Sequence, residues 1–521
     1  MRNSIFITLV SLMCLLLNCN TASKKPEKLN VLFISVDDLG PNLGVYDNEH
    51  IISPNIDAFA EKGTTFKNTF CQAAVCAPSR ASLMTGVRPD STRVWHLGDK
   101  FREINPNAVT MPQYFKKYGY HTVNIGKIFH NYMPDSISWD EPDLRPEQYK
   151  RPEWLKRDGE TFYVNEETQR KQKIKRDKVI AKRPGYYADG WNNGPAWEME
   201  DVHDTVYFDG AQNELAKRTL TRLAKSDEPF YLALGYFRPH LPFAVPKKYW
   251  DLYDRDKIPM ATNSYLPKGA PVFSMNSMYE LRGYDGFKTL KHPSENVMSK
   301  DTARILKHGY YASVSYVDAL FGDLMKHLKS TGLDKNTVII LWGDHGWKLG
   351  EHNSWCKQSN YDIDIHVPMI AYSPYQGKNG GKTEGITELI DMFPSLCELA
   401  GIEAPDYLQG ESFVPLMRNP NQQWKKAAFS QFHRRPKVTP DGGRYMGYSV
   451  RTLEHHYIEW YEWNNETKER GKFVDVELYS LVTDPDENEN LSRQSDNTTK
   501  ELLIELSKTL NAGWQEAKPS I

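Results

Sequence analysis

Apolar segments that run directly into charged side chains constrain the fold of this chain more than any other feature. The segments are Asn30–Val36, His121–Ile125, Phe230–Tyr236, Thr337–Trp342 and Val367–Tyr372. Nearly continuous apolar runs of this length are typical of strands buried on both faces of a mostly parallel sheet. The first four are followed within a few residues by Asp, Lys or His, namely Asp37, Asp38, Lys127, His240, Asp344 and His345. Because ligands bind beyond the carboxyl ends of the strands in such sheets, we expect these side chains to share one site.

Helical patterns alternate with these segments. Within residues 303–332, Leu320, Leu324 and Leu328 repeat at a spacing of four, and Gly332 is a typical helix stop. Residues 54–63, 211–224 and 387–400 also have helical patterns. The alternation predicts an α/β sandwich with a large, mostly parallel mixed sheet between helices.

A polar, turn-rich stretch at residues 417–424 marks a domain boundary. Beyond it lie shorter strand-like runs at 448–453, 456–460 and 477–481, which favour a small C-terminal domain with an antiparallel sheet. The predicted division is a signal segment 1–18, a linker 19–29, a large N-terminal domain 30–418 and a smaller α+β domain 419–521.

The first residues have the pattern of an export signal. Ile5–Leu17 is a mostly apolar run of thirteen residues behind Arg2, and a bilayer span needs about 20. The run ends in Leu-Leu-Leu-Asn before Cys19, which resembles a bacterial lipoprotein signal whose Cys becomes the lipidated first residue. We expect export and a lipid anchor in the outer membrane. An ordinary signal peptide with an incidental Cys19 is the alternative.

Composition excludes several classes of protein. The 65 Lys and Arg residues nearly balance the 67 Asp and Glu residues, so there is no basic excess to bind a nucleic acid. The hydrophobic content of 40% and charged content of 25% exclude a disordered, collagen-like or coiled-coil chain. Residues 171–183 carry seven Lys or Arg and one Asp. We expect a solvated helix or loop face there rather than a patch for an anionic polymer.

Two pairs of side chains have the composition of a metal site. Asp37 and Asp38 follow one predicted strand, and Asp344 and His345 follow another. Three carboxylates and an imidazole at one sheet edge suit a divalent cation, and the oxygen majority favours Ca²⁺ or Mg²⁺. A single Asp in such a place also serves as a helix cap, but the two pairs together favour the metal.

Residues 76–86 read CAPSRASLMTG, a C-x-P-x-R pattern from Cys76 to Arg80 followed by a Thr-Gly turn. This resembles the signature of type I sulfatases. The resemblance extends over residues 30–490 and is closest to the iduronate-2-sulfatase branch, where His occupies the position of His345 and many other sulfatases have Asn. Further matching elements are GKIFH at 126–130, RPH at 238–240 and GDHGW at 343–347. A structural Cys beside a proline turn is the alternative, and it leaves Arg80 unexplained.

The resemblance implies an alkaline-phosphatase-like fold and a sulfuric ester hydrolase with two additions to the chain. One is Ca²⁺, held by Asp37, Asp38, Asp344, His345 and residue 76. The other is formylglycine, which a formylglycine-generating maturation enzyme makes by oxidising Cys76. The hydrated aldehyde offers one hydroxyl as nucleophile and a second hydroxyl whose deprotonation expels sulfate, a step that Ser or Thr cannot perform.

The resemblance also implies roles for other residues. Arg80 would hold the nucleophile and the metal ligands in place. Lys127, His240 and Lys357 would bind the sulfate oxygens, and His240 or Lys357 would protonate the leaving alcohol. His130 would take the proton from the second hydroxyl. Without the family motifs, His130 and His240 are better explained as core histidines, and Lys127 as a loop lysine.

The expected substrate is a sulfated, uronate-containing polysaccharide or its oligosaccharides, of the ulvan or glycosaminoglycan type. The long segments 131–195 and 251–299 are expected to wall the site and to favour exo action. Candidate sugar contacts are His96, Tyr187, Trp191 and Arg451. The alternatives are a phosphate or phosphonate ester hydrolase of the same superfamily, and a non-catalytic polysaccharide-binding lipoprotein with an unconverted Cys76.

Overall fold

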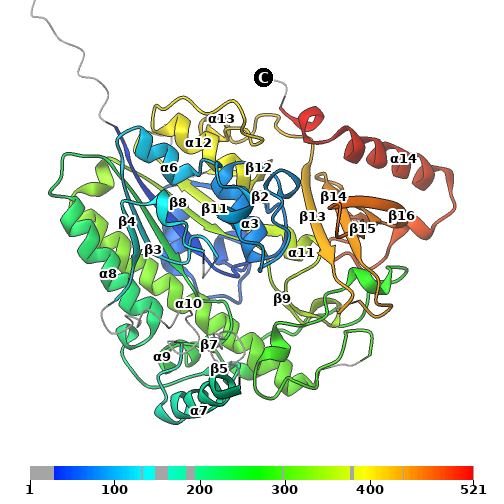
Figure 1. Ribbon diagram of the computed structural model, residues 1–521, viewed down its shortest axis with the longest axis horizontal. Coiled ribbons are helices and arrows are strands. Elements are labelled where there is room, and N and C mark those ends of the chain that lie inside the picture. Colours follow the sequence, from blue (N-terminus) through cyan, green and yellow to red (C-terminus); the bar gives the residue numbers. More distant parts are fainter. Residues whose placement is uncertain are drawn as a thin grey trace, which may run out of the picture.

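The computed structural model (Figure 1) describes residues 28–130, 133–146, 162–182, 194–295, 298–375, 381–437 and 439–519. The predicted signal segment 1–18, Cys19, Tyr187 and Trp191 lie outside these residues. Among the helices of the described ranges, none combines the length and the apolar character that crossing a bilayer requires.

Within the described residues, an eight-stranded mixed sheet forms the centre of the molecule. In spatial order its strands are β12 (Gly381–Glu388), β2 (Thr64–Phe70), β11 (His366–Tyr372), β8 (Thr337–Gly343), β1 (Asn30–Val36), β6 (Phe230–Tyr236), β3 (His121–Gly126) and β4 (Glu141–Leu144). β1 pairs in parallel with β6 and β8, whereas β11 runs antiparallel to β8 and β2. The expected large, mostly parallel mixed sheet is confirmed.

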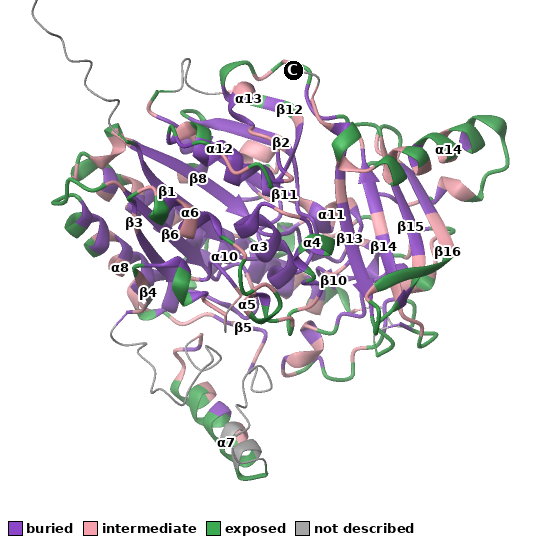
Figure 2. Cartoon of the chain, turned by 45° about the horizontal axis from the view of Figure 1, so that its top comes forward, coloured by how far each residue is buried: buried purple, intermediate pink, exposed green. Residues whose placement is uncertain are grey.

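Helices cover both faces of the sheet, because side chains along β1 alternate between two apolar cores. Leu32, Ile34 and Val36 lie in the core under α2 (Pro54–Ala60), α8 (Phe208–Leu223) and α10 (Lys300–Ser330). Val31 and Phe33 lie in the opposite core, under α3 (Cys76–Thr85), α6 (Met111–Lys117), α12 (Met392–Leu399) and α13 (Val414–Arg418). Figure 2 shows that the central strands are buried on both sides.

A second sheet of four antiparallel strands follows near the C-terminus, to the right of the central sheet in Figure 1. Its strands are β13 (Ala428–Arg434), β14 (Tyr445–Arg451), β15 (His455–Asn464) and β16 (Glu469–Ser480). Leu506 of α14 (Asn497–Ala512) shares a small core with Val450 and Leu478 of this sheet. The expected C-terminal antiparallel sheet is confirmed, and the domain limits 30–418 and 419–521 stay a prediction.

Shorter elements connect these parts. They are α4 (Pro89–Thr92), α5 (Phe101–Ile104), α7 (Glu166–Lys182), α9 (Lys247–Trp250), α11 (Asp362–Ile365), β5 (Trp197–Glu198), β7 (Phe243–Ala244), β9 (Lys348–Leu349) and β10 (Trp355–Cys356). The basic run lies mainly on α7, which extends from the body and is largely exposed (Figure 2). This agrees with the solvated helix face expected there.

The prediction of a single helix over residues 387–400 is wrong. Thr387 and Glu388 end strand β12, and α12 begins only at Met392. The β-branched Thr387 lies opposite Thr69 in a parallel ladder, with the two hydroxyl oxygens 2.8 Å apart. The backbone N–H of Glu388 then donates to Asp391 Oδ2 (2.8 Å), and this turn separates the strand from the helix.

Candidate active site

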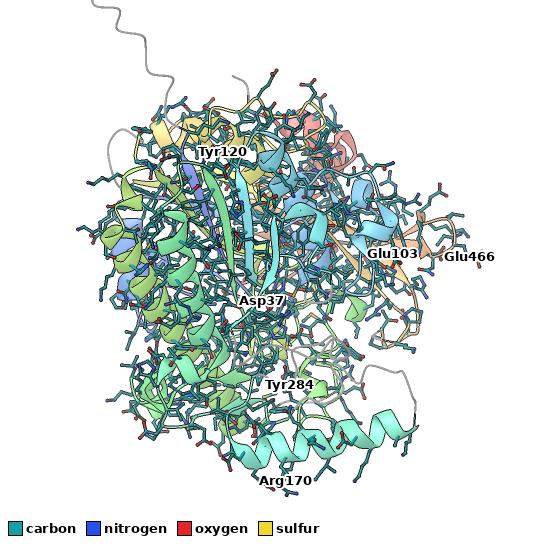
Figure 3. The ribbon with its side chains drawn as sticks, turned by 60° about the vertical axis from the view of Figure 1, so that its left-hand side comes forward. Asp37, Glu103, Tyr120, Arg170, Tyr284 and Glu466 are labelled. Carbon is teal, nitrogen blue, oxygen red and sulfur yellow. The ribbon has the colours of Figure 1, made fainter. Side chains whose placement is uncertain are left out.

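The side chains that follow the predicted strands converge at one end of the central sheet. Asp37 and Asp38 come directly after β1, and Asp344 and His345 come directly after β8, the parallel neighbour of β1. Lys127 follows β3, and all five side chains are buried. Figure 3 labels Asp37 at this end of the sheet. The fold therefore brings these residues together as the strand pattern implied.

Arg80 forms hydrogen bonds with residues that follow three strands of the central sheet. Cys76 opens α3 and Arg80 lies one turn further along, so both side chains emerge on the same face of the helix. The fully buried guanidinium donates from Nη2 to Asp37 Oδ1 (2.9 Å) and from Nε to Asp344 Oδ2 (2.9 Å). Its Nη1 donates to the carbonyl oxygen of Lys127 at 2.7 Å. These bonds fix the start of α3 against β1, β3 and β8.

The Cys76 thiol lies in the middle of the cluster, 3.3 Å from His345 Nε2 and 3.5 Å from Lys127 Nζ. Burial raises the pKa of this thiol well above its usual range, by more than the charges of Lys127 and Lys357 lower it. Since the thiolate is the nucleophilic form of cysteine, an unmodified Cys76 is poorly reactive at neutral pH. The place suits a nucleophile, but the side chain needs chemical conversion to act as one.

Two buried lysines remain charged beside the thiol. Lys127 forms an ion pair with Asp37, and Lys357, next after β10, donates to both carboxylate oxygens of Asp38 at 2.8 Å. Burial lowers the pKa of each amine, but the surrounding negative groups, first among them Asp37 for Lys127 and Asp38 for Lys357, together raise it by more. Both ammonium groups can therefore bind the oxygens of an anionic ester.

Glu280 is a site residue that the sequence motifs missed. It comes from the long segment 251–299, and its Oε1 lies 2.8 Å from Lys357 Nζ and 3.1 Å from His240 Nε2. Burial raises the pKa of Glu280, but Lys357 and His240 lower it by more, so the carboxylate is ionised. No motif surrounds this residue. The one signal that could have found it is its position in a segment expected to wall the site.

Asp209, in the first turn of α8, holds the turn that carries His240. Its two carboxylate oxygens accept hydrogen bonds from the backbone N–H groups of Phe237 (2.8 Å) and Arg238 (2.9 Å). The sequence analysis missed this residue too, because an Asp in the first turn of a helix has a local explanation.

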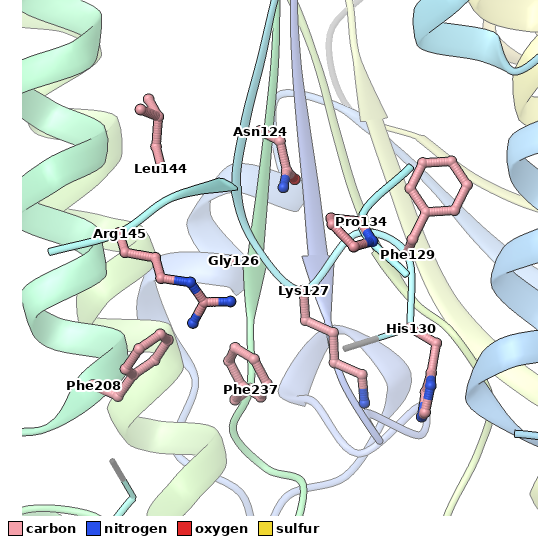
Figure 4. Close-up of a pocket in the computed structure, with 10 residues that line it drawn as sticks. All are labelled: Asn124, Gly126, Lys127, Phe129, His130, Pro134, Leu144, Arg145, Phe208 and Phe237. Carbon is pink, nitrogen blue, oxygen red and sulfur yellow. The ribbon is translucent and has the colours of Figure 1, made fainter. Parts of the chain in front are cut away.

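His130 lines a small pocket of about 20 Å³ together with Lys127 (Figure 4). Both side chains point the same way from the segment after β3, and Phe129 and Phe237 contribute to the apolar lining. Burial, and after it the charge of Lys127, lower the pKa of His130 well below its usual range. The imidazole is therefore neutral, as a proton acceptor must be.

The predicted metal ligands form a cluster whose chemistry fits a divalent cation. Ligand atoms lie within 4.8 Å of one another in three groups, which are Asp38 with Cys76 and His345, Asp37 with Asp38 and His240, and Asp37 with Cys76 and Asp344. Burial raises the pKa of Asp38, because a buried carboxylate loses its hydration, and a bound cation would offset that cost.

The charges around the site also leave room for a cation. The charged groups of the cluster are four carboxylates and three permanent cations, namely Asp37, Asp38, Asp344 and Glu280 against Arg80, Lys127 and Lys357. A divalent ion would make this set positive by one charge, and one sulfate monoester would neutralise it.

Two candidate sugar contacts lie outside the cluster. Arg451 is buried and donates from Nε to Asp362 Oδ1 at 2.9 Å, so this guanidinium has a structural partner and does not face a sugar. His96 lies against His433 of β13, with ring nitrogens 2.5 Å apart.

The family model for sulfatases matches residues 29–402 of the chain. The chain belongs to the sulfatase family. Human iduronate 2-sulfatase is 32% identical to this sulfatase over 95% of this chain and 97% of that protein. An ulvan-active sulfatase of Formosa agariphila is 27% identical over 93% of this chain and 82% of that one. This sulfatase is thus a sulfuric ester hydrolase, of a family that generally uses formylglycine and a divalent metal.

Residues 350–516 of the sulfatase match the model for the C-terminal part of N-sulphoglucosamine sulphohydrolase. A structure in complex with its substrate D-glucosamine-2-N,6-O-disulfate superposes with a TM-score of 0.69 at 19% identity, covering 94% of this chain and 99% of that one. A phosphonate monoester hydrolase of Agrobacterium radiobacter reaches 0.68 at 20% identity, with coverage of 93% and 95%. At these identities the two structures show the shared alkaline-phosphatase-like fold.

Proposed function

We propose that this sulfatase removes sulfate from a uronate-containing sulfated polysaccharide or its oligosaccharides, using Ca²⁺ and a formylglycine made from Cys76. The observation that carries the proposal is the buried cluster in which Arg80 joins the helix of Cys76 to Asp37 and Asp344. One relative is named for iduronate and another for ulvan, which supports a polysaccharide substrate that contains uronate.

The cofactors have defined places in this proposal. The metal would be held by residue 76 together with Asp37, Asp38, Asp344 and His345. Bound there, Ca²⁺ would supply positive charge that polarises the ester and favours ionisation of the attacking hydroxyl. A hydrated formylglycine at position 76 would supply that hydroxyl and the second hydroxyl needed for sulfate release. Arg80 keeps this position fixed through its two carboxylate partners.

The remaining side chains bind the ester and move protons. Lys127 and Lys357 bind the sulfate oxygens, since both amines are charged and face the position of Cys76. His240 protonates the leaving alcohol, because its side chain is 24% exposed whereas that of Lys357 is 1% exposed, which places His240 toward the entering sugar. His130 is neutral and takes the proton of the second hydroxyl.

Mass spectrometry of the peptide that contains residue 76 tests the proposed nucleophile. In protein co-expressed with a formylglycine-generating enzyme, we expect a lower peptide mass from conversion of the thiol to the aldehyde. Cys76→Ala should fold normally and release no sulfate, because a smaller side chain costs little packing here. An active protein with an unmodified thiol, or an active Cys76→Ala variant, would rule out the covalent mechanism.

A phosphate or phosphonate ester hydrolase is the second candidate, and the fold shared with a phosphonate monoester hydrolase favours it. His345 together with His240, both of which lie beside Asp38 (3.3 and 3.9 Å), favours sulfate. Initial rates of sulfate and phosphate release from matched aryl esters decide between the two. The complete buried site argues against a non-catalytic polysaccharide-binding lipoprotein.

Export and lipid anchoring also belong to the proposal, on the basis of the apolar run that ends before Cys19. In a Gram-negative host, the wild-type protein should fractionate with the outer membrane, and Cys19→Ser should not carry lipid. If the two proteins fractionate identically and neither carries lipid, the N-terminal segment is an ordinary signal peptide and Cys19 is incidental.

A further inference from the structure

A surface groove of about 470 Å³ separates α4 and the segment after it from the β14–β16 strands. It is lined by Asp90, Arg93, Trp95, Tyr448, Trp463, Lys468, Glu469 and Arg470. Figure 2 shows α4 beside β13, and the side-chain amide of Gln431 on β13 donates to Asp90 Oδ1 at 2.7 Å. One wall of the groove therefore comes from α4 and the segment after it, and the other comes from the C-terminal sheet. None of the lining residues belongs to the candidate active site.

The floor of the groove is aromatic and held in place. The rings of Trp95 and Trp463 meet edge to face with centroids 5.3 Å apart, and Tyr448 packs against the same cluster. Trp95 Nε1 donates to Asp90 Oδ1 at 3.0 Å, which fixes the ring. Trp95 and Trp463 are largely buried, and Tyr448 is half-buried, so the groove meets the edges of these rings and the accessible part of Tyr448. Because the rings are fixed, they offer this small apolar contact at little entropic cost.

The rim of the groove is cationic. Arg93, Lys468 and Arg470 line it, and Arg435 and Arg444 stand beside the adjoining His433. In the part of the chain that the structure describes, no carboxylate lies within 4.0 Å of any of these five cations. Arg470 instead lies over the ring of Tyr461, and Lys468 donates to an Asn side chain. These charges are available to an anion from solvent.

Two acidic residues are also present, and they do not cancel this field. Asp90 Oδ1 accepts hydrogen bonds from Trp95 and Gln431, so this carboxylate holds the aromatic floor in place. Glu469 is exposed at the start of β16. Burial, and then the neighbouring His96 and Arg444, lower the pKa of His433 to about 2.

A short path of contacts joins the groove to the active site. The ring of His433 lies 5.8 Å from that of Trp463 in the groove. The next residue, Arg434, is buried and donates from Nη1 to the carbonyl oxygen of Gln358 (2.5 Å), which follows Lys357 in the chain. Strand β13 therefore contacts the groove through His433 and the segment that carries Lys357 through Arg434.

We propose that this groove is a second carbohydrate-binding site, which holds sulfate or carboxylate groups of the polysaccharide outside the sugar whose ester is cleaved. The cations of the rim, which have no carboxylate partner among the described residues, would bind its anionic substituents, and the accessible part of Tyr448 would contact a sugar ring. This inference rests on the proposed function for the identity of the polymer. It assigns to Arg93, Lys468 and Arg470 a role in affinity for longer chains and no role in the chemistry.

Charge removal at the rim tests the proposal with the full-length protein. The variant is Arg93→Ser with Arg470→Ser, both exposed, and its matched control is Lys225→Ser with Lys335→Ser, exposed at the opposite end of the central sheet. In a Cys76→Ala background, affinity for a sulfated glycosaminoglycan should fall about tenfold, or about 1.4 kcal/mol, in the rim variant and less than twofold in the control. In the active protein, kcat/KM should fall similarly for a sulfated hexasaccharide and stay unchanged for a sulfated monosaccharide.

Several results would overturn the second site. These are an unchanged affinity for the polymer, an equal loss on the hexasaccharide and the monosaccharide, or an equal effect of the control variant. Duplex DNA serves as a second polyanion, and binding of DNA as tight as that of the glycosaminoglycan would show plain charge attraction instead. If the wild-type protein released sulfate from no carbohydrate, the proposed function would fail, while the binding measurement would still decide whether the groove holds a sulfated chain.

Discussion

Glu280 sets the charge between the two residues that can deliver a proton to the leaving alcohol. Replacing it with Gln keeps its shape but removes the anion shared by Lys357 and His240. We expect kcat to fall roughly 10- to 100-fold with a smaller change in KM, because an outer partner of catalytic groups typically has an effect of that size. Steady-state kinetics on a small sulfate ester measure this split. Glu295→Gln, an exposed change in the same segment, is the matched control, and equal kinetics for both variants would remove Glu280 from the site.

Asp38 is the residue on which the metal proposal depends most, since its carboxylate faces both His345 (3.3 Å) and Lys357 (2.8 Å). Chelation should abolish activity, and Ca²⁺ should restore it better than Zn²⁺ because most of the ligand atoms are hard oxygens. Asp38→Asn should weaken Ca²⁺ binding in calorimetry, and Asp251→Asn, which is exposed, should not. Full activity after verified metal removal would contradict the proposed site.

Site residues that lie within sequence motifs could be predicted from the sequence, whereas the site residue that comes from a long connecting segment could not. The placement of Cys76 and Arg80 four positions apart determined which face of α3 they share. Glu280 enters the site from a segment without local pattern, so only the folded chain reveals it. Arg451 failed as a sugar contact because its partner, Asp362, is 89 residues away in the chain.

The elements with continuous apolar runs were predictable to within about one residue, as β1 and β6 show. Strands β2 and β12 were missed because they are rich in Thr, Asn, Lys and Glu, whose polar atoms are satisfied by the neighbouring strand. Asn68 of β2, for example, donates to the backbone carbonyl of Glu384 on β12 at 3.0 Å. Polar strands such as the edge strand β12 and its neighbour β2 carry little hydrophobic signal, so their position depends on tertiary pairing.

The end of β12 carries a buried ion pair that should control acid stability. Glu388 accepts two hydrogen bonds from the Arg88 guanidinium (2.8 and 2.7 Å) and one from Lys425 (2.9 Å). Burial raises the pKa of Glu388, but Arg88 and Lys425 lower it by more, to about 2 from an ordinary value of 4.5. Its stabilising contribution is therefore complete above pH 4.5 and is lost as the pH falls toward 2.

Glu388→Gln should lower the free energy of unfolding by about 3–5 kcal/mol near neutral pH, because it leaves the buried Arg88 guanidinium without its carboxylate partner, whereas Lys425 keeps its ion pair with Asp391. The deficit should shrink as the pH falls below 4.5, since Glu388 is then protonated in the unfolded wild type and the ion pair contributes less to stability. Urea unfolding at several pH values measures both effects, with Glu384→Gln on the exposed face of the same strand as control. A deficit that does not change with pH would assign the loss to packing.

At the scale of the whole molecule, the long connections decide how a polymer reaches the site. The segment 251–299 already delivers Glu280 to the cluster, and we predict that it restricts entry to chain ends and short oligosaccharides. The same expectation for segment 131–195 falls in large part on residues outside the described ranges. Initial sulfate release per sulfated residue should therefore be faster from lyase-shortened oligosaccharides than from intact polymer. Equal rates would indicate an open groove with endo action.

The burial of Cys76 has a consequence for the order of events during synthesis. The thiol is 2% exposed and every residue of α3 is buried, so an enzyme that modifies Cys76 has to reach it before the fold closes. The strands that enclose α3 from β8 onward lie more than 250 residues downstream, which at 5–20 residues per second is roughly 13–50 s of translation. If Cys76 is converted as proposed, the yield of active protein depends on whether conversion or folding comes first, because a chain that folds first buries its thiol.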